Sequence, residues 1–184
     1  MSNIFFHSDY HFGHQKVFSF CPQTRSRWDN VDQMDEELIE IWNSRIQPGD
    51  TFYFLGDFSY HRDEEKTEKI FKALKGQKFL CVGNHDPRHV RKLAWSGVFD
   101  YRRIKIDKQV IILHHYPIAE WDLFFRQSWH LYGHVHGRTP LPDSWKALDV
   151  GFDGKFQLPI SFDELQEYML RRENTRKDAP EWIS

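Results

Sequence analysis

The stretch Ile4-Phe5-Phe6-His7-Ser8-Asp9-Tyr10-His11 joins a short apolar segment directly to two side chains that can bind a metal ion. Apolar segments that run into Asp, Asn or His side chains occur three more times, at residues 51–57, 78–86 and 129–136. Short apolar runs bounded by glycine and turn residues favour buried strands. Because the sheet of a layered α/β fold presents loop residues at one edge, we predict an α/β fold with its functional site at the strand ends.

The segments between these strands carry helical signals. The apolar spacing predicts helices over residues 32–46, 64–74, 87–95 and 161–171, and the last begins with the capping box Ser161-x-x-Glu164. Further strands are expected at residues 101–106, 110–114 and 147–150, with a loop near 120–126. We predict one domain over residues 1–171 and a polar, loosely held tail over residues 172–184.

Composition limits the classes of function. The chain has 184 residues, of which 40% are hydrophobic and 28% charged, so it can bury one ordinary core. A net charge of -2 disfavours, but does not exclude, a protein that binds nucleic acid. Cys81 lies in an apolar run and is expected to be a buried thiol. We find neither a secretion signal nor a membrane-spanning stretch and expect a cytoplasmic protein.

Histidine is abundant, and seven of the eleven histidines lie in four short segments. Asp9 and His11 are two residues apart, as are His134 and His136, so an extended backbone would point each pair to one side. Taken singly, D-x-H is a weak signal, Gly56-Asp57 is ordinary turn chemistry, and G-H-x-H is moderately suggestive. Together, at the ends of apolar runs, they indicate a site for divalent Mn, Fe, Zn or Co, because the ligands are oxygen and nitrogen without thiolate.

The order D-x-H, G-D, G-N-H-D, H, G-H-x-H resembles the calcineurin-like metallophosphoesterase superfamily between Ile4 and Asp153. Residues 8–14, 34–39 and 115–118 look closest to a small bacterial and phage subgroup of predicted phosphoesterases. The resemblance implies a four-layer sandwich of two central mixed sheets flanked by helices. It also implies two divalent ions, with Mn as the first choice and Fe, Zn, Ni or Co as alternatives. Three residues would hold the first ion, three the second, and one would bridge them: Asp9, His11 and His136; Asn84, His115 and His134; and Asp57.

The fourth motif leaves a choice between two adjacent histidines. Alternation along a strand points His114 and His115 in opposite directions. The ligand in this subgroup is the histidine before Tyr-Pro, which implies His115. His114 would then lie in the core or behind the ligands.

Two further residues are candidates for proton transfer. His85 follows Asn84 and would face the leaving group, where an imidazolium could protonate the departing oxygen. Asp86 could orient the His85 ring and raise its pKa, or could instead cap the helix that starts at Pro87. His14 and Arg138 are candidates for contacts with the substrate phosphate. Arg25, Arg27 and Arg88 are weaker candidates of the same kind.

These residues predict hydrolysis of phosphate esters by a metal-activated water. Small nucleotide phosphodiesters, including cyclic ones, are the favoured substrates because the chain has no insertion long enough for a cap domain. Phosphomonoesters, including phosphoproteins, come second, and nucleic-acid ends come third. A metal-free scaffold module is the alternative of another class, and it is disfavoured because every ligand position is filled.

Overall fold

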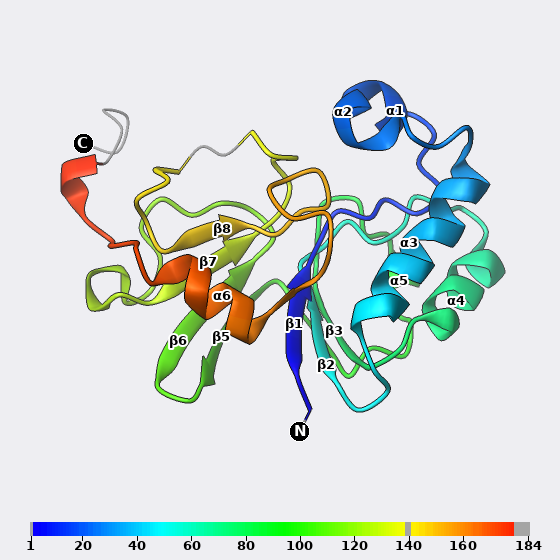
Figure 1. Ribbon diagram of the computed structural model, residues 1–184. Helices are drawn as coiled ribbons and strands as arrows, with labels where there is room; N and C mark the ends of the chain where they lie inside the picture. The colour runs from blue at the N-terminus through cyan, green and yellow to red at the C-terminus, as the bar shows by residue number, and fades with distance from the viewer. Residues whose placement is uncertain (1, 139–140, 179–184) are drawn as a thin grey trace.

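The computed structural model describes residues 2–138 and 141–178, and within them it contains two mixed β-sheets (Figure 1). In spatial order the first sheet contains β4 (Gly97–Phe99), β3 (Gln77–Cys81), β2 (Thr51–Phe54), β1 (Ile4–His7) and β9 (Ile160–Ser161). The second contains β5 (Tyr101–Ile106), β6 (Gln109–His114), β7 (Trp129–Tyr132) and β8 (Ala147–Asp149). In the first sheet only β9 is antiparallel to its neighbour, and in the second only β5, so the predicted α/β fold with two mixed sheets is confirmed.

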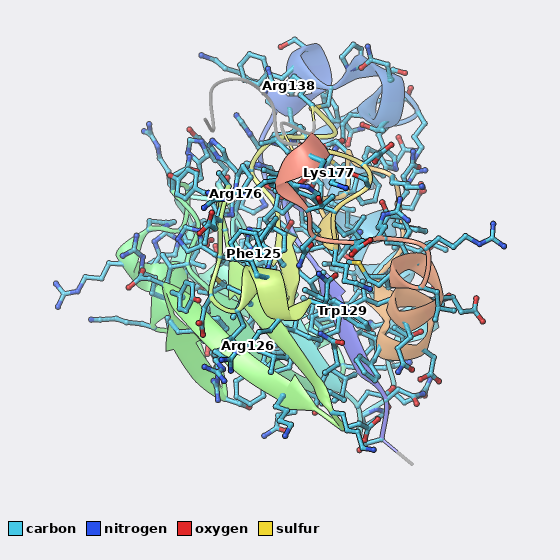
Figure 2. The ribbon with its side chains drawn as sticks, turned by 90° about the vertical axis from the view of Figure 1, so that its left-hand side faces the viewer. Phe125, Arg126, Trp129, Arg138, Arg176 and Lys177 are labelled. Carbon is cyan, nitrogen blue, oxygen red and sulfur yellow. The ribbon has the colours of Figure 1, made fainter. Side chains whose placement is uncertain are left out.

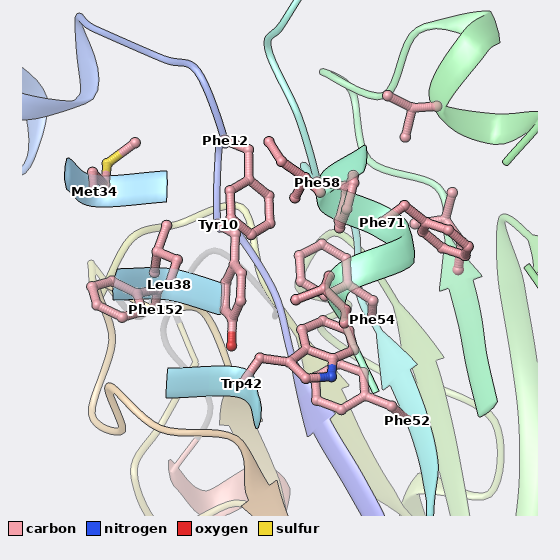
Figure 3. Close-up of a cluster of buried hydrophobic side chains, with 14 of the residues drawn as sticks. Tyr10, Phe12, Met34, Leu38, Trp42, Phe52, Phe54, Phe58, Phe71 and Phe152 are labelled. Atoms are coloured by element: carbon pink, nitrogen blue, oxygen red, sulfur yellow. The ribbon is translucent and has the colours of Figure 1, made fainter. Parts of the chain in front are cut away.

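Helices α3 (Val31–Arg45), α4 (Glu64–Ala73) and α5 (Arg88–Arg91) cover the outer face of the five-stranded sheet (Figure 1). Side chains alternate along a strand, so Phe52 and Phe54 of β2 face these helices. The indole of Trp42 stacks on Phe52 with ring centroids 3.7 Å apart, at the centre of an aromatic core (Figure 3). This core fixes the register of α3 against the sheet that carries the site.

A second core fills the space between the two sheets. Phe6 of β1 lies there with Leu113 of β6 and Leu131 of β7, and all three are fully buried. Helix α6 (Phe162–Met169) closes one side of this core with Leu165. The predicted capping box at its start is confirmed, since the Ser161 side chain accepts from the Glu164 N–H and the Glu164 side chain accepts from the Ser161 N–H.

The outer face of the four-stranded sheet is covered differently. Its core includes three large aromatic side chains: Trp121 and Phe124 at the one-turn 3-10 helix η1 (Phe124–Arg126), and Trp145 from the loop before β8. The Trp121 indole N–H donates to the Ser128 hydroxyl at 3.0 Å, which satisfies its polar atom inside this layer. Loops with bulky aromatic rings therefore cover the outer face of this sheet, whereas helices cover the outer face of the other.

The predicted boundaries differ from the observed ones mostly by one to three residues, and besides the 3-10 helices four short elements lay outside the prediction. These are α1 (Val17–Phe20), α2 (Pro22–Arg25), β4 and β9, each too short to show a period. The predicted helix over residues 87–95 is only the single turn α5.

Residues 172–178, the first part of the predicted polar tail, contact the loop layer of the second sheet. The buried Asn174 side chain donates to the carbonyls of Phe124 and Ser128, both at 2.9 Å, and the Trp145 indole N–H donates to the Thr175 carbonyl. Backbone polar groups of the loop layer thus find their partners in this segment, which ends in η2 (Arg176–Asp178). The rest of the expected tail, 179–184, lies outside the described residues.

Candidate metal centre

The predicted ligands lie just beyond the carboxyl ends of five strands, β1, β2, β3, β6 and β7. Backbone hydrogen bonds hold the loop after β1 against the loop after β2: the Asp9 N–H donates to the Gly56 carbonyl and the His11 N–H to the Asp57 carbonyl, both at 3.0 Å. The Ser8 N–H donates to Val150 O at 3.1 Å, which ties the end of β1 to the second sheet. The two sheets therefore meet at the site.

The ligand loops have an unusual backbone conformation. Five of the seven predicted ligands have positive φ angles in the left-handed region: Asp9 (58°), His11 (53°), Asp57 (58°), His134 (69°) and His136 (48°). The expectation that an extended chain points each pair to one side is wrong, because tight left-handed turns aim these side chains instead. Such a conformation costs roughly 1–2 kcal/mol per non-glycine residue. Strain of this kind typically concentrates where a function requires it.

Asp9, His11 and His136 form a first group, with one ligating atom from each lying within 4.8 Å of the others. His11 Nε2 is 3.9 Å from Asp9 Oδ1 and 3.5 Å from Asp57 Oδ2. The Asp9 carboxylate also accepts the Ser8 hydroxyl at 2.5 Å and the His134 N–H at 3.0 Å, which fixes its orientation. These atoms surround a volume of the size that one ion needs.

Asp57, His115 and His134 form a second group of the same kind. Asn84 joins it, since its Oδ1 lies 3.0 Å from His115 Nε2 and 2.9 Å from His134 Nδ1. His115 Nε2 is 3.6 Å from Asp57 Oδ2, the same oxygen that faces His11. The structure thus brings all seven predicted ligands together, with Asp57 between the two groups.

The choice between the adjacent histidines is visible in their contacts. His115 is fully buried, and its Nδ1 donates to the Leu55 carbonyl at 2.7 Å, which turns Nε2 toward Asp57. His114 Nδ1 instead hydrogen-bonds the backbone of Tyr116. The structure places His115 in the cluster and His114 outside it, as expected.

Two glycines allow the close approach of the loops. A Cβ atom on Gly83 would overlap the backbone nitrogen and carboxylate of Asp57, and one on Gly133 would overlap the Asp9 carboxylate and the Ser8 hydroxyl. Any side chain at either position would push a predicted ligand out of place.

The chemistry of the cluster fits divalent cations. Both ring nitrogens of His11 are buried and have no hydrogen-bond partner among the described residues. Burial, and after it the negative charge of Asp57, raises the pKa of Asp9 well above its ordinary value. Buried polar atoms without partners and adjacent buried carboxylates are both costly, and a cation between them relieves both costs. Oxygen and imidazole ligands suit divalent transition metals.

A residue that the sequence reasoning missed, Asp153, lies behind His136. Its Oδ2 accepts from His136 Nδ1 at 2.8 Å and from Arg25 Nη2 at 2.9 Å. Its Oδ1 accepts from Arg25 Nε at 2.7 Å. Burial alone would lower the pKa of His136, but the hydrogen bond to Asp153 and the charges of Asp9 and Asp153 outweigh it and raise that pKa. The sequence indicated this role only faintly, because Asp153 is a single acidic residue at the end of the region that resembles the family.

Arg25 was a candidate for a contact with the substrate phosphate, and the structure contradicts this role. Its side chain is fully buried, and besides Asp153 it donates to the backbone carbonyls of Asp9 at 2.7 Å and Tyr10 at 3.0 Å. The guanidinium therefore holds the loop of Asp9 in place and has no free donor face toward a substrate.

Asp86 also differs from both expected arrangements. Its carboxylate accepts three backbone N–H bonds, from Asp57 at 2.9 Å, Phe58 at 2.8 Å and Gly83 at 2.7 Å. These bonds use both oxygens to lock the Asp57 loop, so Asp86 is not placed to orient His85. Helix α5 is preceded by Pro87 and has no side-chain cap. We assign Asp86 a structural role beneath the ligands.

A cleft of about 830 Å³ opens over the cluster. His85, His14 and Arg138 all line it, so the structure brings these predicted residues to the site. The exposed His85 ring is 5.7 Å from that of His11. The helices α1 and α2, which the sequence did not predict, also line this cleft.

Comparison with known proteins places these observations in a family. A model of the calcineurin-like phosphoesterases matches residues 3–183. A gene 66 protein of Mycobacterium phage L5 is 33% identical over 199 residues, covering 91% of this chain and 94% of that protein. An uncharacterized protein of Methanocaldococcus jannaschii is 29% identical over 169 residues, covering 89% of each chain.

Among solved structures, a protein of unknown function from Aquifex aeolicus superimposes with a TM-score of 0.73 at 24% identity, covering 91% of this chain and 99% of that one. This likeness concerns the fold. Among the helices of the described ranges 2–138 and 141–178, none has the length and apolar character needed to span a membrane.

Proposed function

Because the chain belongs to the calcineurin-like phosphoesterase family and is thereby a metal-dependent hydrolase of phosphoric esters, we propose that it holds two divalent ions and cleaves small nucleotide phosphodiesters, cyclic ones included. One observation carries the dinuclear assignment. Asp57 Oδ2 lies 3.5 Å from His11 Nε2 and 3.6 Å from His115 Nε2, so one carboxylate oxygen faces a histidine of each group. A shared carboxylate is what a pair of ions about 3.5–4 Å apart requires.

In this proposal Asp9, His11 and His136 hold one ion, and Asn84, His115 and His134 hold the other. Bound there, the ions activate water and neutralise the charge that develops on the phosphate. The oxygen and nitrogen ligands suit divalent transition metals, and the resemblance to the family makes Mn the first choice, with Fe, Zn, Ni or Co as alternatives. The buried hydrogen bonds from His115 to the Leu55 carbonyl and from His136 to Asp153 hold both rings in fixed orientations before any ion arrives.

The proton for the leaving group is assigned to His85. Its backbone N–H donates to Asp57 Oδ1 at 2.8 Å, which anchors the residue beside the bridging carboxylate. Its side chain is exposed in the cleft, where a departing alkoxide can reach the ring. His14 and Arg138, in the walls of the same cleft, are proposed to contact the phosphate or its substituents.

The size of the cleft supports a small ester. About 830 Å³ is within the range of sites for small molecules, and a chain with a net charge of -2 lacks the basic excess that long nucleic acids require. Phosphomonoesters remain the second class.

The test combines metal analysis with two chromogenic esters. The Mn-loaded protein is assayed with bis(p-nitrophenyl) phosphate and p-nitrophenyl phosphate, and bound metal is counted by mass spectrometry. We expect two ions per chain and a kcat/KM for the diester at least tenfold above that for the monoester. One ion per chain would overturn the dinuclear site, and the reverse preference would overturn the diester assignment.

A further inference from the structure

The cleft beside the metal centre has a wall of aromatic rings. The ring of His14 stacks on that of Tyr60, with centroids 4.0 Å apart and planes 7° from parallel. Phe20 of α1 meets His14 on another side, with centroids 6.1 Å apart and planes at 64°. Tyr60 and His85 are 5.1 Å apart. All four residues line the same cleft.

This wall begins at the ligands. The His11 ring is 5.3 Å from that of His14 and 6.5 Å from that of Tyr60, so a phosphate on the ions would have its nearest substituent against these rings. The outer two rings remain accessible: the Phe20 side chain is 68% exposed and Tyr60 is 44% exposed. Large exposed aromatic rings beside a polar centre are typical of a ligand-binding surface.

From this arrangement we infer that Phe20 and Tyr60 form a subsite for the nucleobase of a nucleoside phosphate, and this inference rests on the proposed function. A base is planar and can stack its π-system on such rings, whereas the ribose of the same nucleotide has no π-system. Ser19 and Gln23 line the cleft beside Phe20 and offer hydrogen-bonding groups to the polar edge of a base. The short helices α1 and α2 thus carry the part of the cleft that selects the substrate.

The first experiment measures binding with two phosphomonoesters, the poorer class of substrate in the proposed function. The Mn-loaded full chain is titrated calorimetrically with adenosine 5′-phosphate and with ribose 5-phosphate, which differ only by the base. We expect the nucleotide to bind about 5- to 100-fold more tightly, the range that stacking of one base provides. Equal affinity for the two ligands would overturn the subsite.

The second experiment measures selectivity in hydrolysis. Adenosine 2′,3′-cyclic phosphate is compared with glycerol 1,2-cyclic phosphate, which has the same five-membered ester ring and no base. We expect Phe20→Ala and Tyr60→Leu each to lower the ratio of kcat/KM for the two esters at least fivefold, chiefly through KM for the nucleotide. Phe20→Trp should keep the ratio. An unchanged ratio in Phe20→Ala would overturn the role of that ring.

Phe125→Ala is the matched control, because Phe125 is also an exposed phenylalanine, at 54%, but lies on η1, well apart from Arg138 at the cleft (Figure 2). The two proposals can fail separately. Tight, Phe20-dependent binding of the nucleotide without hydrolysis of any diester would retain the subsite and reject the diesterase. Diester hydrolysis without preference for a base would do the opposite.

Discussion

Asp153 Oδ2 lies 2.8 Å from Nδ1 of His136, and this contact links the predicted ligand to the fully buried guanidinium of Arg25. The three residues of this series of contacts come from distant segments. Arg25 lies in α2, Asp153 in the loop after β8 and His136 in the loop after β7. A carboxylate behind a ligating histidine fixes the ring and its tautomer. Through Asp153, the orientation of His136 in the first group of ligands therefore depends on helix α2, which lines the cleft.

We predict that Asp153→Asn weakens metal binding. The amide has one acceptor oxygen and no negative charge, so its NH2 group would face a donor of either His136 or Arg25. The His136 ring is therefore held less firmly. Loss of such a partner typically lowers metal affinity about 10- to 100-fold. A Mn titration of activity should show this shift in half-saturation, with kcat largely recovered at saturating Mn.

The matched control is Asp143→Asn, because Asp143 is an exposed acid on a surface loop. It should leave the titration unchanged. If Asp153→Asn bound Mn as tightly as the parent chain, the orienting role of Asp153 would be rejected.

We predict that Gly83→Ala disrupts the site through packing alone. The new methyl group would overlap the backbone and carboxylate of Asp57, so the bridging residue must move. We expect loss of at least one of the two ions and a fall in activity of more than 100-fold, since both groups of ligands share Asp57. Metal content and kcat/KM for the diester measure the two effects.

Gly49→Ala serves as the control for the substitution itself, since a Cβ at Gly49 meets nothing within 4 Å. Its metal content and activity should match those of the parent chain. Normal metal content in Gly83→Ala would contradict the close approach of the two loops.

His85→Asn is predicted to keep both ions and lose turnover. The backbone N–H of residue 85 still donates to Asp57, so the bridging carboxylate stays in place, whereas the ring that donates the proton is gone. General acid catalysis contributes about 10²- to 10⁴-fold, and we expect a loss of kcat in that range.

The dependence on the leaving group provides a sharper readout for His85. The loss in His85→Asn should be much smaller for a p-nitrophenyl ester, whose leaving group needs little protonation, than for an alkyl ester. Equal losses for both esters, or an unchanged kcat at full metal content, would sink the proton-donor assignment.

Much of this site could be predicted from sequence because its residues follow apolar strands that are visible as short runs. Asp57 and Asn84 come directly after such runs, and a parallel sheet must bring their strand ends together. The left-handed backbone of His134 could not be read this way, because only the packing of the loops shows which turn the chain adopts.

The residues that support the ligands were harder to predict. Asp86 and Arg25 looked like catalytic or phosphate-binding groups, and both turned out to hydrogen-bond the backbone of the ligand loops. Their backbone partners lie up to 29 residues away, as in the pair Asp57 and Asp86, so no local pattern indicates them. The cleft wall at Phe20 was missed because a four-residue helix leaves no periodicity.

The last prediction concerns stability and pH, and it depends on His130, a buried residue of β7. The neutral ring is fixed at both nitrogens: Nδ1 donates to the Ile112 carbonyl at 3.2 Å, and Nε2 accepts from the Ile118 N–H at 3.1 Å. Burial lowers the pKa of His130 to about 3 in the folded protein, whereas the unfolded chain keeps a pKa of about 6.5. Protonation would remove the acceptor at Nε2 and place a charge in the core.

The sign follows from proton binding. Between pH 6.5 and pH 3 the unfolded chain holds a proton on this histidine that the folded protein does not, so acid favours unfolding. The stabilisation from His130 is fully present above pH 6.5 and falls by about 1.4 kcal/mol for each pH unit below it. Urea denaturation of the metal-free chain at pH 7, 6 and 5 measures this slope. His130→Asn, though less stable at pH 7, should show a slope smaller by about that amount, and parallel slopes for the two proteins would contradict the prediction.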